Sequence, residues 1–373
     1  MRKRILVPFG VAAALLVSAC ASSPAAPAPA AAPARAEAVR ADLDGLIRAG
    51  AVGALATLSE NGTDTVLAAG VADAAAGRAM PADVPQYVRV GSLTKTFTAA
   101  LVLQLVDQGS IGLDQPVETY LPGLLRGDGV DGRAITVRQL LGHRSGLPEP
   151  ALSPEVDEYE AARTGRTFTP AQEIDLVLRY PAQFAPGARF QYTNANYLVA
   201  GMLIEAVTGH SYAEELRTRI LTPLALTHTY LPATGETGLR DPHPNGYETV
   251  DGAPADRTRI EPSLPWTSGA LVSTGADLNR FYTALLAGRV VPPAMLTQML
   301  DGVDMGNGDG MSYGLGVGYT ELPCGRYVGH VGGVRGFTAV SGATAAGRAV
   351  TFSFTGTPAD ADLGGLLTRA LCG

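Results

Sequence analysis

The chain has 373 residues, of which 46% are hydrophobic and 17% are charged, so it is apolar enough to fold around a large core. Its formal net charge is −7, which argues against nucleic acid as a partner.

Residues 1–19 predict an export signal. Arg2, Lys3 and Arg4 precede an apolar run over residues 5–17, which is shorter than the ~20 residues of a membrane-spanning helix. Residues 17–20 (Val-Ser-Ala-Cys) resemble a bacterial lipobox, with Cys20 as the lipid-modified residue. Ordinary cleavage after a small residue is the alternative. We therefore expect an exported cell-surface lipoprotein, attached to the membrane only through this anchor, or otherwise a secreted protein.

Residues 20–37 are rich in Ala and Pro and have no apolar periodicity, so they predict a disordered tether. We expect one folded domain over residues 38–373. Its two cysteines, Cys324 and Cys372, form an even pair in an exported chain, which favours a disulfide. The chain-entropy model assigns about 4 kcal/mol of stabilisation to such a bridge. Two unrelated buried thiols are the alternative.

Strand patterns concentrate at the two ends of this domain. Residues 52–58 and 65–71 flank an Asn61-Gly62 turn, and a C-terminal helix is expected over 363–371. Four glycine-separated runs near the C-terminus also predict strands: 313–320, 326–331, 336–340 and 349–354. Helical patterns occupy the middle of the chain: 137–141, 170–179, 197–208, 213–220, 276–286 and 293–300.

The expected fold class is α/β plus all-α. Residues 38–91 and 311–373 would form one antiparallel sheet flanked by helices, and residues 92–310 would be a large helical insertion.

Ser92 and Lys95 form the strongest candidate site. The chain has 28 basic residues, and all except Lys3 and Lys95 are arginine, so the domain keeps one lysine. A desolvated lysine can give up its proton and arginine cannot, which suggests proton-transfer chemistry at Lys95. On a helix, residues i and i+3 lie about 5–6 Å apart, where the lysine amine could activate the serine hydroxyl for acyl transfer. A serine that only caps the helix is the alternative.

Two further motifs could complete this site. In Tyr192-Thr193-Asn194, a phenol beside a cation could act as a general base, and the amide could hold a substrate carbonyl. In the run from His330 to Gly333, backbone N–H groups of Gly333 and Ser92 could form an oxyanion hole. The alternatives are a loop tyrosine with an Asn helix cap, and a strand-end histidine before a glycine turn.

Other patterns in the sequence do not predict a site. Residues 310–314 fit Gly-x-Ser-x-Gly, but a glycine-rich loop precedes them and a strand pattern follows, so they do not predict a nucleophile elbow. The sequence has no metal-binding or phosphate-loop pattern, so no cofactor or metal is expected.

The motifs Ser92-Leu93-Thr94-Lys95, Tyr192-Thr193-Asn194 and His330-Val331-Gly332, in this order, resemble those of penicillin-recognising serine enzymes. The likeness extends over residues 38–373. It is strongest to secreted actinomycete-type D-alanyl-D-alanine carboxypeptidases in the class C β-lactamase-like superfamily.

This resemblance implies a role for each motif. Ser92 would attack a peptide or β-lactam carbonyl, while Lys95 and Tyr192 would move protons and Asn194 would orient the acyl side chain. His330 takes the place of the third motif's Lys or His. Two further features match the family: a site-lining tryptophan at Trp266, for which a core aromatic is an equal alternative, and a disulfide between Cys324 and Cys372.

Three positions depart from the family pattern. Val331 stands where a hydroxyl residue helps to bind the substrate carboxylate, and Gly333 replaces a further threonine. A strand arginine of the peptidases aligns near Gly318. Arg335 could bind the substrate carboxylate in place of these residues. Without a cation there, an ester or amide substrate would fit better.

We therefore expect a monomeric serine hydrolase that acts through an acyl-enzyme on cell-wall peptides as a carboxypeptidase. An esterase or a β-lactamase acting on small ester or β-lactam substrates is the alternative enzyme. A tethered lipoprotein that binds cell-wall peptide or β-lactam without turnover is the alternative from a different class.

Overall fold

A computed structural model describes residues 31–306, 308, 310–359 and 361–373. The expected export signal and Cys20 lie outside these residues and stay predictions. Within the described part of the chain, no helix is both long enough and apolar enough to cross a membrane.

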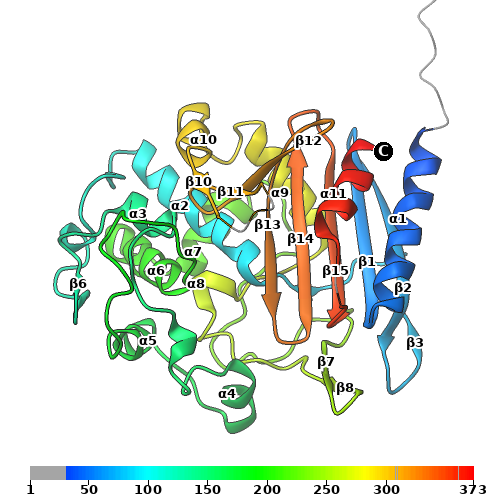
Figure 1. Ribbon diagram of the computed structural model, residues 1–373, viewed down its shortest axis with the longest axis horizontal. Coiled ribbons are helices and arrows are strands. Elements are labelled where there is room, and N and C mark those ends of the chain that lie inside the picture. The colour runs from blue at the N-terminus through cyan, green and yellow to red at the C-terminus, as the bar shows by residue number, and fades with distance from the viewer. Residues whose placement is uncertain (1–30, 307, 309, 360) are drawn as a thin grey trace, which may run out of the picture.

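A nine-stranded antiparallel sheet unites the two ends of the chain (Figure 1). In spatial order its strands are β10 (Val303–Asp304), β11 (Ser312–Tyr313), β12 (Gly318–Leu322), β13 (Gly325–Val334), β14 (Phe337–Thr344), β15 (Ala349–Gly356), β1 (Ala51–Glu60), β2 (Thr63–Asp73) and β3 (Arg78–Ala79). The predicted Asn61-Gly62 turn connects β1 and β2, and both of its residues have positive φ, as such a turn requires. The predicted fold class is confirmed.

Helices cover both faces of this sheet. α1 (Ala31–Arg48) and α11 (Leu363–Cys372) pack together on one face and bury leucines against β1 and β15. On the other face, α9 (Gly275–Leu286) packs against β14 and β15, and α2 (Thr94–Asp107) extends the core into the helical region. Because the interior strand β1 is covered on both sides, seven of its ten residues are buried and its sequence does not alternate between polar and apolar.

The helical region lies beside the sheet in Figure 1 and contains the remaining elements. Its helices are α3 (Val137–Leu141), α4 (Glu158–Thr164), α5 (Pro170–Val177), α6 (Ala195–Thr208), α7 (Tyr212–Leu216) with a π-helical continuation (Arg217–Leu221), α8 (Trp266–Gly269) and α10 (Pro293–Met299), with 3-10 turns at Gly91–Leu93, Val117–Thr119 and Pro150–Leu152. Its short strands pair as β4 (Val88–Arg89) with β9 (Val272–Ser273), β5 (Arg126–Gly127) with β6 (Val130–Asp131), and β7 (Tyr247–Val250) with β8 (Ala253–Asp256).

The predicted tether is wrong over residues 31–37, which form the first turns of α1. Alanine has the highest helix propensity, so an Ala-rich segment folds as a helix where it has a surface to pack on. Arg35 is 8% exposed and forms an ion pair of 2.8 Å with Glu60 of β1. This contact, about 25 residues away in the sequence, is not visible in local composition.

Three other expectations need correction. Residues 313–320 do not form one strand, because the chain turns between β11 and β12 at Gly316, which has φ +79° and lies against Ala99. The sheet also includes β10, so the expected boundary at residue 310, between the helical insertion and the C-terminal part of the sheet, is wrong. Residues 38–91 do not all join the main sheet, because β4, directly before the Ser92 turn, pairs with β9 instead. The sequence analysis also missed the short helices α4 and α8.

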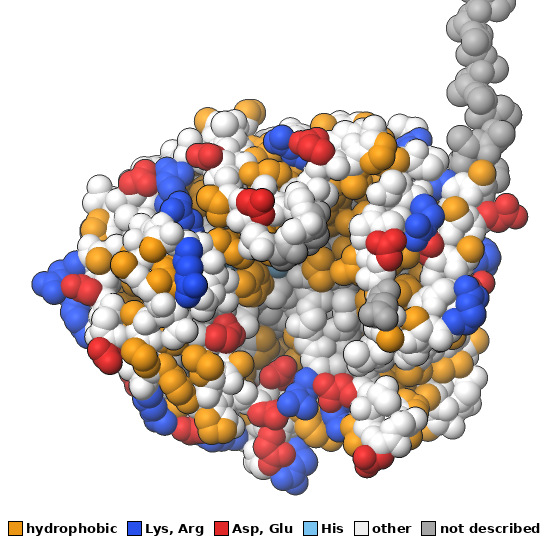
Figure 2. All heavy atoms as spheres, in the orientation of Figure 1, with side chains coloured by type: hydrophobic (Ala, Val, Ile, Leu, Met, Phe, Trp, Pro, Cys, Tyr) orange, Lys and Arg blue, Asp and Glu red, His pale blue; other side chains and the backbone are white. Residues whose placement is uncertain are grey.

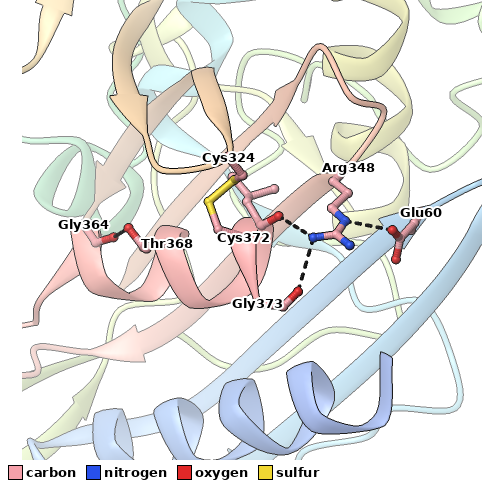
Figure 3. The surroundings of a disulfide bond; sticks show 8 residues. Glu60, Cys324, Arg348, Gly364, Thr368, Cys372 and Gly373 are labelled. Carbon is pink, nitrogen blue, oxygen red and sulfur yellow. Dashed lines mark hydrogen bonds and ion pairs between the residues drawn. A yellow bond between two sulfur atoms is a disulfide. The ribbon is translucent and has the colours of Figure 1, made fainter. Parts of the chain in front are cut away.

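The predicted disulfide is present, and it joins Cys324, after β12, to Cys372 at the end of α11, with 5.2 Å between the Cα atoms. Figure 3 shows that Arg348 lies beside it. The guanidinium donates to the carbonyl oxygens of Leu371 (2.9 Å) and Gly373 (3.2 Å) and also to Glu60 (2.7 Å). These contacts hold the last helix against the sheet.

Candidate active site

Ser92 lies on the 3-10 turn Gly91–Leu93, directly before α2, and is half-buried. The expected helix therefore begins two residues later than Ser92, but the serine still lies at its N-terminal end. Gly91 has φ +53°, and a Cβ at this position would lie 2.7 Å from the backbone nitrogen of Gly333. A glycine is required here because the chain reverses while it contacts β13.

Lys95 is completely buried and uses all three donors of an ammonium group. Its Nζ lies 3.0 Å from Ser92 Oγ, 2.7 Å from Asn194 Oδ1 and 2.8 Å from the carbonyl oxygen of Ser268. Burial lowers the pKa of Lys95 to about 7, against an opposing contribution from the Glu149 carboxylate. At neutral pH a large fraction of Lys95 is therefore an uncharged amine, positioned to accept the Ser92 proton.

This pKa predicts the pH dependence of the reaction. Protonated Lys95 cannot accept the serine proton, so kcat/KM for an uncharged substrate should fall about tenfold per pH unit below pH 7 and level off above about pH 8. A pH–rate profile with a neutral p-nitrophenyl ester measures this directly. A flat profile between pH 5 and 8 would mean that Lys95 does not titrate in the reaction.

Asn194 is held by Glu149, a residue that the sequence analysis missed. The carboxylate of Glu149 accepts from the backbone N–H of Asn194 and from its Nδ2, both at 2.7 Å. These bonds fix the amide so that Oδ1 faces Lys95. Glu149 lies between two prolines in a loop, and no local pattern distinguishes it from a surface carboxylate.

Tyr192 is close to Lys95, whose Nζ lies 4.9 Å from the centroid of the phenol ring. The buried Oη makes no hydrogen bond of normal geometry. Burial raises the pKa of Tyr192, although interaction with Ser92 opposes this effect. The phenol is therefore neutral at neutral pH, and it fits a proton donor better than the general base that the sequence analysis considered.

His143 supports this segment. Its Nδ1 accepts from the backbone N–H of Thr193 at 3.2 Å and lies 3.1 Å from Nδ2 of Asn196. Its ring packs against Tyr192 with 4.1 Å between ring centroids. Burial keeps the pKa of His143 well below its usual value, so it acts as a neutral support under Tyr192 and Thr193.

His330 is also uncharged. Its Nδ1 lies 2.6 Å from the carbonyl oxygen of Val331, which can only accept, so Nδ1 carries the proton. Nε2 then accepts from the Tyr313 hydroxyl at 2.9 Å. Burial lowers the pKa of His330 to about 3, so the third motif offers no positive charge to a substrate. The sequence analysis missed Tyr313, which it treated only as part of a strand.

Glycines let β13 approach the nucleophile closely. A Cβ on Gly332 would overlap the carbonyl oxygen of Val90 and lie 2.8 Å from the backbone nitrogen of Ser92. Gly333 and Ser92 line one cavity. This arrangement brings together the two residues expected to supply the oxyanion hole.

Two cavities flank Ser92, in the hollow between the helical region and the sheet that Figure 2 shows. The first, of about 200 Å³, is here called the acidic cavity and is lined by Ser92, Glu149, Pro150, Ala151, Val156, Glu158, Glu173, Asn194, Leu264, Pro265, Ser268, Gly269, Gly333 and Val334. The second, of about 290 Å³, is here called the apolar cavity and is lined by Ser92, Tyr192, Met305, Met311, Tyr313, Gly318, His330 and Val331.

Four of the expected site residues line neither cavity: Lys95 and Gly332, whose contacts are described above, and Trp266 and Arg335. Trp266, at the start of α8, packs edge-on against Tyr212 with 6.0 Å between ring centroids, as expected for a core aromatic. Arg335 forms ion pairs with Asp157 (3.0 Å) and Glu248 (3.5 Å) at the end of the β13–β14 hairpin. Ser312 of the rejected Gly-x-Ser-x-Gly motif lies on β11 and lines neither cavity. Among the described residues, no group of three or more His, Cys, Asp or Glu is arranged to hold a metal ion.

Comparison with known proteins gives consistent matches over this whole region. The protein-family model described as Beta-lactamase matches residues 35–371. Penicillin-binding protein 4 of Amycolatopsis lactamdurans is 31% identical over 228 residues, which are 61% of this chain and 57% of that protein. The chain spans about half the length of the curated relatives it matches, with 41–58% for three of them.

Two solved structures are similar over nearly their full length. The D-stereospecific amidohydrolase from Streptomyces sp. has a TM-score of 0.82 and 33% identity, with coverage of 90% of this chain and 98% of that chain. The D-amino acid amidase from Ochrobactrum anthropi SV3, complexed with L-phenylalanine amide, has a TM-score of 0.77 and 27% identity, with coverage of 90% and 97%. The likeness therefore includes both the sheet and the helices that surround Ser92.

Proposed function

The chain belongs to the Beta-lactamase family and is a serine hydrolase of that family, and we propose that it is an amidohydrolase acting through an acyl-enzyme on Ser92. The observation that carries this proposal is the completely buried amine of Lys95, 3.0 Å from the Ser92 hydroxyl. Pure binding would not require a lysine whose pKa is lowered to about 7.

The site groups supply each proton transfer. Neutral Lys95 takes the proton of Ser92 while Oγ attacks the carbonyl carbon, and the N–H groups of Ser92 and Gly333 stabilise the oxyanion. As the C–N bond breaks, the neutral phenol of Tyr192 donates a proton to the leaving nitrogen and regains one from protonated Lys95. Water then cleaves the ester of Ser92: Lys95 accepts the proton of the water and passes it to the departing Ser92 Oγ, which restores the free serine and the neutral amine.

The apolar cavity favours an uncharged leaving group. Val331 and Gly318 line it. By the resemblance described above, Val331 stands at the position, and Gly318 near the position, of groups that bind a substrate carboxylate in the carboxypeptidases. None of its described lining residues is basic, and His330 is neutral. A carboxylate in this cavity would lose its hydration without gaining a partner, whereas an amide or ester would not. An amide substrate also agrees with the two similar solved structures, a D-stereospecific amidohydrolase and a D-amino acid amidase.

The D-alanyl-D-alanine carboxypeptidase expected from the motifs is the second candidate. It would need Arg335 to turn away from Asp157 and Glu248 and bind the terminal carboxylate. A similarity to penicillin-binding protein 4 favours it.

The test combines intact mass spectrometry with a pair of substrates. Incubation with benzylpenicillin should leave an acyl adduct on Ser92, and D-phenylalaninamide should be cleaved faster than a peptide ending in D-Ala-D-Ala. Faster cleavage of the peptide ending in D-Ala-D-Ala would support the carboxypeptidase. Hydrolysis of penicillin without an adduct would support a β-lactamase. Neither an adduct nor cleavage of any substrate would contradict an acyl-enzyme mechanism and support a binding protein.

A further inference from the structure

The acidic cavity contains more carboxyl groups than the proposed chemistry uses. Glu149 holds Asn194, but Glu158 of α4 and Glu173 of α5 line the same cavity without any part in that arrangement. None of the described residues that line this cavity is basic.

Glu173 is buried without compensation. It is 2% exposed, and its Oε2 makes no hydrogen bond. Burial, reinforced by repulsion from Glu149 and Glu158, raises the pKa of Glu173 well above its usual value. Burial also raises the pKa of Glu158, and a hydrogen bond with its own backbone and the charge of Arg335 oppose this only in part. A buried carboxyl group without a partner lowers the stability of the fold, so its presence here indicates a function.

Helix capping does not explain Glu173. The N-terminus of α5 is already capped by Thr169, whose side chain accepts from the backbone N–H of Gln172 while Gln172 bonds back to Thr169. The neighbouring wall of the cavity is apolar, with Val156 and Leu264. A carboxyl group that faces a cavity beside a nucleophile, with no partner of its own, is arranged to receive one.

We propose that the acidic cavity is a subsite for the ammonium group of the substrate, held by Glu173 and Glu158 on the acyl side of the scissile bond. The inference rests on the proposed function and narrows its substrate class to amides of amino acids with a free amine. The acyl side is assigned from Asn194 and Gly333, which line this cavity with Ser92, whereas the apolar cavity takes the leaving group. An incoming ammonium replaces the proton that the buried carboxyl groups otherwise retain, and it satisfies Oε2 of Glu173.

The test compares D-alanine p-nitroanilide with its N-acetyl derivative, which have the same leaving group. We expect the wild-type protein to prefer the free amine by at least about tenfold in kcat/KM. Glu173→Gln keeps the shape and removes the charge, and it should lower kcat/KM for the free amine by about 10- to 100-fold, with a much smaller effect on the acetylated substrate. Glu158→Gln should act in the same direction.

Glu160→Gln is the matched control, because Glu160 lies on the same helix as Glu158 but is exposed and paired with Arg163. Glu160→Gln should leave the ratio of kcat/KM between the free amine and the acetylated substrate unchanged. Equal loss on both substrates in Glu173→Gln, or no preference for the free amine in the wild-type protein, would overturn the subsite. If benzylpenicillin still acylates Ser92 in that case, the proposed function stands; if Ser92 reacts with no substrate, the proposed function fails first.

Discussion

Replacement of Ser92 by alanine is expected to lower kcat for amide hydrolysis by about 10⁴- to 10⁶-fold. Among the described residues, the Ser92 hydroxyl is the only group that lies within hydrogen-bond reach of Lys95 Nζ and can also form an ester with the substrate. The variant should also show no mass shift after incubation with benzylpenicillin. Steady-state kinetics and intact mass spectrometry on the same preparation measure both effects.

Substrate affinity provides the control for this variant. Ser92 is half-buried on a 3-10 turn, and its removal leaves the acidic and apolar cavities in place, so Ser92→Ala should still bind a slowly hydrolysed amide. A variant that keeps more than about a hundredth of wild-type turnover would show that another residue is the nucleophile.

Lys95→Arg is expected to lower kcat/KM by about 10²- to 10⁴-fold, although it preserves a positive charge. Arginine stays protonated in proteins, so it can bond to Ser92 and Asn194 but cannot accept the serine proton. The pH–rate profile of the residual activity should lose the step near pH 7 that Lys95 produces in the wild-type protein.

Because Lys95 is completely buried, the larger guanidinium could also disturb packing, and a second variant separates the two effects. Lys95→Met has a similar volume and no charge, so it should fold with a Tm at or above the wild-type value and be equally inactive. Near-wild-type turnover by folded Lys95→Arg would contradict proton transfer through this residue.

The candidate catalytic groups could be proposed from the sequence because they occur in local patterns. Ser92 and Lys95 are three residues apart on one helical stretch, and Tyr192 and Asn194 belong to one short motif. The strands β1 and β2 were predictable for the same reason, since a turn signal separates two runs of strand-forming residues.

The groups that tune the site could not be predicted in this way. Glu149 and Tyr313 bond to residues far away in the sequence, and Glu173 lines a cavity that distant segments form together, so nothing near these three residues in the chain marks them. Asn194 lies 45 residues from Glu149, and His330 lies 17 residues from Tyr313. The same reason explains α1, whose first turns are ordered by packing on a sheet that forms from both chain ends.

Arg335 is the opposite case: its place in the sequence suggested a role in the site, but its side chain lies elsewhere. Its position two residues after Gly333 suggested a cation for the substrate, but sequence proximity does not give side-chain direction at the end of a hairpin. Asp157, at the N-terminus of α4, and Glu248 of β7 are the groups that the side chain meets.

The single lysine of the domain also allows the unfolding of the domain to be measured by proteolysis. A lysine-specific endoprotease has one target bond in residues 31–373, between Lys95 and Thr96, and both residues are 0% exposed in the folded protein. Cleavage there requires opening of α2, so the fraction of uncut chain after a short protease pulse reports the folded population. The disulfide joins two cysteines on the same side of this bond, so the two fragments separate without reduction.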